Sequence, residues 1–164
     1  MSKGFLCATL LLLCISLIGC IGLAHAPSRQ IAAIPAGAQE QLSLNVDLPK
    51  QSASWEIGLW PSAVATNIAD LTGKHLVVRL TNVSDRKLTL TPGVGSAFEK
   101  RLIVAPGQSV VVSDAVIQSH AQMTSLFGCD ANEHGVSFQL NLQFRPPVQI
   151  QEPINVRARG RDVL

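Results

Sequence analysis

The chain contains no tyrosine, and aromatic residues make up only 4% of its 164 residues. Charged residues are also few, at 15%, and the formal net charge at pH 7 is +2. Proteins that bind nucleic acids normally carry a strong basic surplus, so this balance argues against a nucleic-acid partner. Apolar residues, in contrast, make up 47% of the chain. That share is enough to build a core and argues against wholesale disorder.

Sequence motifs of catalysis are missing as well. The chain has neither the H-E-x-x-H motif of metalloproteases nor the phosphate-binding G-x(4)-G-K loop. The stretch Gly93-Val94-Gly95-Ser96 lacks the glycine after serine that would complete the G-x-S-x-G turn of hydrolases. We therefore predict a protein that is not an enzyme, has no catalytic residue and needs no cofactor.

The first residues are typical of a secretory signal peptide. Lys3 provides a positive charge, and an apolar, uncharged run follows from Phe5 to Gly19. The run ends on Leu17-Ile18-Gly19-Cys20, which resembles the lipobox of bacterial lipoproteins. The resemblance implies that residues 1–19 are removed and that the Cys20 thiol carries a diacylglyceryl group, with fatty acids such as palmitate. Cys20 then begins the mature protein and anchors it to a membrane.

Two other outcomes compete with lipidation. Ala24-His25-Ala26 is a second candidate cleavage site, although Pro27 hinders cleavage there, and its use would give a secreted protein. Left uncleaved, Phe5–Ala24 is long enough for a membrane-spanning anchor helix. Residue 21 is Ile, whereas Asp at this place resembles an inner-membrane retention signal of enteric bacteria. We therefore expect the outer membrane, with the protein facing the periplasm or the cell surface.

The rest of the chain divides by its composition. Residues 20–40 are predicted to form the lipidated N-terminus and a tether, because Ala26–Gln41 contains two prolines and one glycine and shows no regular period. A lead-in strand is the alternative. Residues 41–158 are predicted to form one domain. The basic tail, residues 159–164, is expected to be solvated, with contact to anionic headgroups or an acidic partner as the alternative.

Alternation of apolar and polar residues dominates from residue 41 onward and indicates half-buried strands. The clearest case is 136–144. The predicted strands lie at 42–48, 55–59, 76–80, 88–90, 98–104, 110–112, 136–144 and 148–156, the last interrupted by Pro153. About eight strands without intervening helices predict an all-β, antiparallel sandwich.

The strands and turns of HLVVRLTNVSDRKLTL and LIVAPGQSVVV resemble those of immunoglobulin (Ig)-like domains. The resemblance implies an Ig-like β-sandwich, although the Cys…Trp…Cys core of antibody domains is absent. The segment from Ser113 to Phe127 lacks alternation. It fits either a short helix capped by Ser113 or Asp114, or a loop with one helical turn.

Cys129 is the cysteine that remains if the signal peptide is removed and Cys20 is acylated. In an oxidising compartment we expect a buried free thiol, with an intermolecular disulfide or a bridge to an unacylated Cys20 as alternatives. The polar segment FGCDANEHG gives a second hypothesis, in which Cys129, His134 and His120 bind a metal ion. An ordinary hairpin loop is the simpler expectation, so we predict no metal site.

The polar side of the strand at 136–144 consists of Ser, Gln, Asn and Gln and carries no charge. It fits either a central strand with a solvated outer face, or a face or edge that pairs with a partner by strand addition. The leading hypothesis is a non-enzymatic, lipid-anchored envelope protein that presents its domain to a protein partner, as an accessory or structural subunit of an assembly. A periplasmic module that binds a metal or small ligand through Cys129 and His134 is the alternative.

Overall fold

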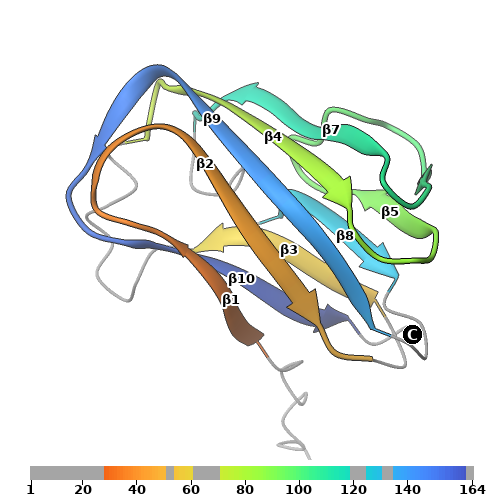
Figure 1. The fold of residues 1–164 in the computed structure, drawn as a ribbon. Coiled ribbons are helices and arrows are strands. Elements are labelled where there is room, and N and C mark those ends of the chain that lie inside the picture. The colour runs from red at the N-terminus through yellow and green to blue at the C-terminus, as the bar shows by residue number, and fades with distance from the viewer. Residues whose placement is uncertain (1–27, 51–53, 61–70, 119–124, 131–134, 162–164) are drawn as a thin grey trace, which may run out of the picture.

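The computed structural model describes residues 28–50, 54–60, 71–118, 125–130 and 135–161 (Figure 1). These residues form an all-β fold without a helix, which confirms the predicted class. Their ten strands are β1 (Ser28–Ile34), β2 (Gly37–Leu48), β3 (Ser54–Trp60), β4 (His75–Asn82), β5 (Leu88–Pro92), β6 (Leu102–Val104), β7 (Ser109–Val116), β8 (Phe127–Asp130), β9 (Val136–Ile150) and β10 (Ile154–Arg161).

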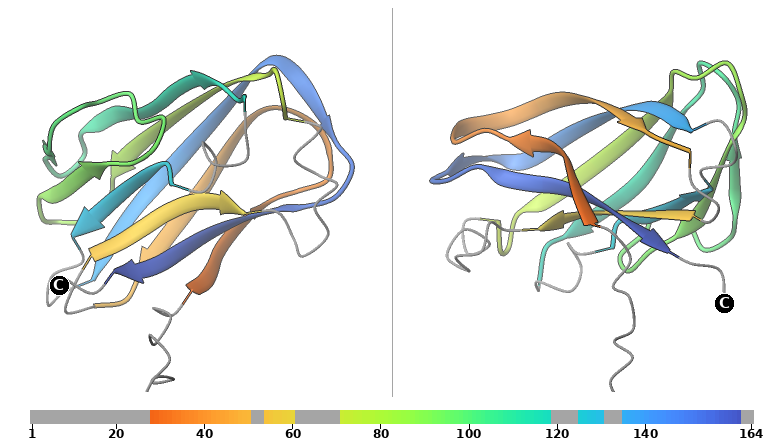
Figure 2. Two further views of the ribbon diagram at one scale, coloured as in Figure 1. Left: turned by 180° about the vertical axis from the view of Figure 1, so that it is seen from behind. Right: turned by 90° about the horizontal axis from the view of Figure 1, so that it is seen from below.

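The strands are arranged in two antiparallel sheets. One sheet has six strands in the order β1-β10-β3-β8-β5-β6, and the other has four in the order β2-β9-β4-β7. The sheets form separate layers (Figures 1 and 2). Apart from the β5–β6 pair, each strand lies in the opposite sheet from the strand before it in the chain. Ig-like domains place consecutive strands such as A and B in one sheet, so the predicted Ig-like order differs from the observed one.

Alternation directs one side of each strand into a shared core. Along β9, the apolar residues from Val136 to Phe144 are buried, and the polar residues between them are half-buried. Buried residues of both sheets belong to one hydrophobic cluster. The rings of Phe127 in β8 and Phe138 in β9 meet edge-on between the layers, with centroids 5.9 Å apart. Neither sheet is therefore an independent unit.

The two ends of the domain differ from the sequence prediction. Residues 28–40, predicted as a tether, form β1 and the first part of β2, which pair with β10 and β9. A bulge between Gln30 and Ala32 interrupts the alternation of β1 and conceals it in the sequence. At the other end, Arg159–Arg161 continue β10 instead of starting a tail. The predicted signal or anchor helix within residues 1–27 lies outside the described residues.

Two internal segments also differ from the prediction. β9 continues through Pro146 and Pro147, so residues 148–150 belong to β9 and Pro153 lies in its connection to β10. The helix expected to start at Ser113 or Asp114 does not form there, because residues 109–116 pair with β4 as β7. β8, predicted as loop, is a buried strand between β3 and β5. In each case pairing with distant strands decides the local structure, which the local pattern does not reveal.

Candidate functional site

Cys129 lies in β8, inside the six-stranded sheet, with β3 on one side and β5 on the other. Its thiol is buried and free, as the sequence predicts. Burial raises the pKa of the Cys129 thiol to about 12, with a further increase from the negative charge of Asp130 and an opposing effect of a backbone hydrogen bond with Trp55. Reactive and metal-binding cysteines are thiolates, so this neutral, enclosed thiol is suited to packing.

The metal hypothesis for this segment gains no support from the described residues. Asp130 forms an ion pair with Arg101. The described part of the chain contains no group of three or more side chains placed to hold a metal ion. His120 and His134, the other predicted ligands, lie outside the described residues.

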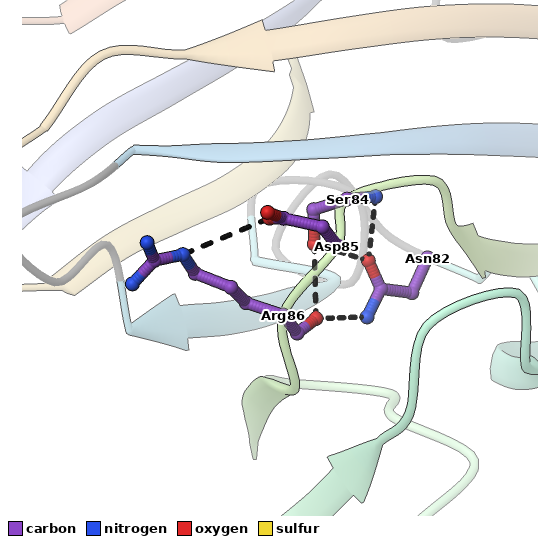
Figure 3. A network of polar contacts seen from close by, with 4 residues as sticks. All are labelled: Asn82, Ser84, Asp85 and Arg86. Atoms are coloured by element: carbon purple, nitrogen blue, oxygen red, sulfur yellow. Dashed lines mark hydrogen bonds and ion pairs between the residues drawn. The ribbon is translucent and has the colours of Figure 1, made fainter.

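Asn82 organises the corner that follows β4 (Figure 3). Its side chain is buried, and Nδ2 donates hydrogen bonds to the carbonyl oxygens of Arg86, at 2.7 Å, and Val104, at 3.0 Å. The backbone N–H and the hydroxyl of Ser84 donate to Asn82 Oδ1 at 2.9 and 2.6 Å. Since the donors and the acceptor of the amide are all used, Asn82 has a structural role and its side chain offers no free group to a ligand.

A histidine–carboxylate pair lies on the outer face of the four-stranded sheet. His75 Nε2 is 2.6 Å from Asp114 Oδ1, and both side chains are partly exposed. The residues opposite the pair in the strand register are Val77, Val116 and Arg145. None of these is a nucleophile, so the pair is best explained as a surface contact between β4 and β7.

Three of the four sheet edges are protected against pairing with another chain. β6 is only three residues long, and β1 carries its bulge. The middle of β7 is covered, because Ser96 bridges to Ser113 and the N–H of Ala97 donates to the carbonyl of Val112 at 3.0 Å. Short strands, bulges and covering loops are the usual protections of sheet edges.

The fourth edge, β2, has a bulge between Gln39 and Gln41 but lacks these protections from Gln41 to Leu48. This stretch pairs without interruption with β9 on one side, and among the described residues no strand lies on its other side. It contains neither Lys nor Pro, and Asp47 is its one charged residue. Leu42 and Leu44 face the core but are only half-buried, as expected beside an open edge. We call residues 41–48 the open edge.

A polar face adjoins the open edge. Three side-chain hydrogen bonds link β2 to β9 there: Ser43 Oγ to Asn141 Oδ1, 2.5 Å; Ser137 Oγ to Asp47 Oδ1, 2.6 Å; and Gln139 Nε2 to Asn45 Oδ1, 3.2 Å. β9 lies between β2 and β4, so both of its edges are occupied. The uncharged strand singled out in the sequence is therefore a central strand with a solvated outer face, and its neighbour β2 provides the edge. Sequence reasoning missed β2 because edge position depends on the order of strands.

Comparisons with known proteins give no relative. No family model matches the chain, and neither a curated protein nor a solved structure is significantly similar to it. Within the described residues, no helix is long and apolar enough to cross a membrane.

Proposed function

We propose that this protein is a non-enzymatic, lipid-anchored protein of the bacterial cell envelope that binds a protein partner at the open edge of β2. The observation that carries the proposal is the contrast between residues 41–48 of β2, which pair with β9 without a bulge, and the three protected edges. A partner strand added here would form main-chain hydrogen bonds with β2, and its side chains would meet the polar face. Such a protein is suited to be an accessory or structural subunit of an envelope assembly.

We also propose a jelly-roll form of β-sandwich in place of the Ig-like form. The support is the pairing of eight strands: β1 with β10, β2 with β9, β3 with β8, and β4 with β7. In a jelly roll the first strand pairs with the last, the second with the second-last, and so on inward, as these four pairs do. The β5–β6 hairpin is then an insertion that extends one sheet. Sandwiches of this kind serve many functions, so the fold alone does not identify one.

Lipidation of Cys20 is the proposed anchor, supported by the apolar run and the lipobox-like Leu17–Cys20. Mass spectrometry of the mature N-terminus tests it. We expect an acylated Cys20 as the first residue, and a Cys20→Ser variant that no longer floats with the outer membrane. An unmodified chain that starts at Met1 or Pro27 would contradict this proposal.

The open edge is tested by photo-crosslinking in intact cells. A photoreactive amino acid replaces Ser43 in β2 or, as the matched control, Ser109 at the other edge of the same sheet; both serines are exposed. We expect a crosslinked product of defined mass from position 43 and not from position 109. Asn45→Lys, which adds an edge charge, should remove the product while the protein stays folded. Equal products from both positions, or none, would count against the open edge.

No contact among the described residues favours the metal- or ligand-binding alternative. Metal analysis of the purified protein and of a Cys129→Ser variant would reveal such a site. Stoichiometric metal that is lost on substitution would reverse the ranking of the two functions.

A further inference from the structure

Arginines gather at the end of β10, next to the start of β1. Arg157 and Arg159 alternate along β10 and therefore share the outer face of the six-stranded sheet. In the register with β1, Arg159 lies opposite Ser28 and Arg157 lies opposite Gln30. Arg29, between these two β1 residues, is exposed but lies opposite the buried Ala158, so its side chain points to the other side of the sheet. We call Arg157 and Arg159 the arginine surface.

The charge of the arginine surface is largely uncompensated. Within the described residues, neither of its two arginines takes part in an ion pair. Arg157 Nε is buried without a hydrogen-bond partner, so this side chain is held against the sheet instead of extending freely into solvent. Glu56 lies opposite Arg159 on β3 and offsets one charge. A net positive surface remains, with guanidinium groups that suit phosphate oxygens.

The position of this surface relative to the proposed anchor identifies its partner. The described chain begins at Ser28, eight residues after Cys20 and next to Arg159. A fully extended segment of eight residues spans at most about 28 Å, and a flexible one averages roughly 15 Å. Because residues 28–40 are strands, the tether is much shorter than the sequence predicts. A lipid on Cys20 therefore keeps the arginine surface near the bilayer.

We propose that the arginine surface docks on the anionic phospholipid headgroups of the membrane that holds the anchor, an inference that rests on the proposed lipidation of Cys20. Charge attraction acts over a Debye length of about 8 Å, so only a short tether lets it contribute. Each arginine beside an anionic bilayer strengthens the attachment about fivefold. Docking would fix the orientation of the domain and leave the open edge of β2, in the other sheet, turned toward a partner.

The test uses the mature full chain in vesicles. Cys129 is buried and Cys20 is proposed to be acylated, so a cysteine introduced at Gln30 can be labelled with an environment-sensitive fluorophore. The vesicles contain phosphatidylcholine alone or a mixture with phosphatidylglycerol. We expect a blue shift of emission in the mixture only, at low salt. A label at Asn45, in the four-stranded sheet, should show no shift.

Charge variants decide whether the arginines cause the shift. In R157Q/R159Q, the ratio of docked to undocked protein should fall about 25-fold. The matched control, Arg86→Gln together with Lys87→Gln at exposed positions before β5, should keep the shift. The same emission in both vesicle types, or an unchanged shift in R157Q/R159Q, would overturn the inference. A shift produced by polyglutamate but not by phosphatidylglycerol would assign the surface to an acidic polypeptide and also overturn it.

Flotation of the vesicles distinguishes a failure of the proposed headgroup docking from a failure of the proposed lipid anchor. Protein that floats with both vesicle types but shows no lipid-dependent shift keeps its anchor and overturns the docking. If the wild type floats only with vesicles that contain phosphatidylglycerol, and R157Q/R159Q does not float, the result overturns the anchor and supports membrane binding by the arginine surface. Protein that floats with neither vesicle type overturns both.

Discussion

At the scale of single residues, Cys129 shows how its surroundings decide what a cysteine does. The side chain lies between β3 and β5, opposite Trp55 on one side and Leu90 on the other. The apolar setting disfavours the thiolate and raises the pKa of Cys129 to about 12. The sequence around Cys129 is compatible with a disulfide or a metal ligand; the strand that encloses this cysteine gives it a packing role.

The raised pKa of Cys129 predicts a loss of stability at alkaline pH. Between pH 9.0 and about 12 the folded protein keeps a thiol proton that the unfolded chain has lost. The free energy of unfolding should therefore fall as the pH rises through this window, by up to about 1.4 kcal/mol per pH unit. Urea unfolding of the wild type and of Cys129→Ala, below and within the window, measures this difference. Equal slopes in the two proteins would contradict the assignment.

At the scale of elements, two identical dipeptides serve different purposes. Pro106-Gly107 forms a turn in which Gly107 has a φ of +73° and Gln108 N–H donates to the carbonyl of Ala105, at 3.0 Å. These are features of a type II turn. Gly93, after Pro92, has no positive φ. A Cβ there would lie 2.8 Å from the carbonyl carbon of Leu126, and closer still to the carbonyl oxygen of Ser125. Gly107 is therefore needed because it adopts a positive φ, and Gly93 is needed because there is no room for a side chain.

Substitutions separate these two roles. Gly93→Ala should cost about 3 kcal/mol or more, because a backbone segment must move, whereas Gly107→Ala should cost about 1–2 kcal/mol of conformational strain. Asn tolerates a positive φ, so Gly107→Asn should recover most of the stability while Gly93→Asn should not. Urea unfolding measures all four variants. Recovery at both positions would contradict the packing role of Gly93.

The same elements show what the sequence can predict. Alternation identifies the core strands β2, β3, β4 and β9, because half-buried strands require it. It does not reveal β8, because this strand has only four residues and its first polar residue with a charge is the last one, Asp130, so that no alternation can be seen. Nor does it reveal that β2 is an edge, since strand order is set by contacts between distant segments. The open edge of β2 could therefore be identified only from the structure. The burial of Cys129, in contrast, could be predicted from the sequence.

At the scale of the whole molecule, the alternation of strands between the sheets couples both layers. Almost every connection crosses from one sheet to the other, and one hydrophobic cluster draws on both. Neither layer can unfold without exposing the apolar face of its partner. We therefore expect a single cooperative unfolding transition. Both tryptophans lie in β3, so tryptophan fluorescence reports on the unfolding of a strand of the six-stranded sheet.

A substitution in the other sheet tests this coupling. Leu140 is buried in β9, so Leu140→Ala should cost about 2–5 kcal/mol. The tryptophan fluorescence transition in β3 should shift with it, to the same urea concentration as the circular dichroism of all strands. Val116→Ala is the matched control, because this residue of the same sheet is 45% exposed and should cost less than about 0.5 kcal/mol. If Leu140→Ala left the fluorescence midpoint unchanged, the two sheets would be separate folding units, and the shared core would not be what holds them together.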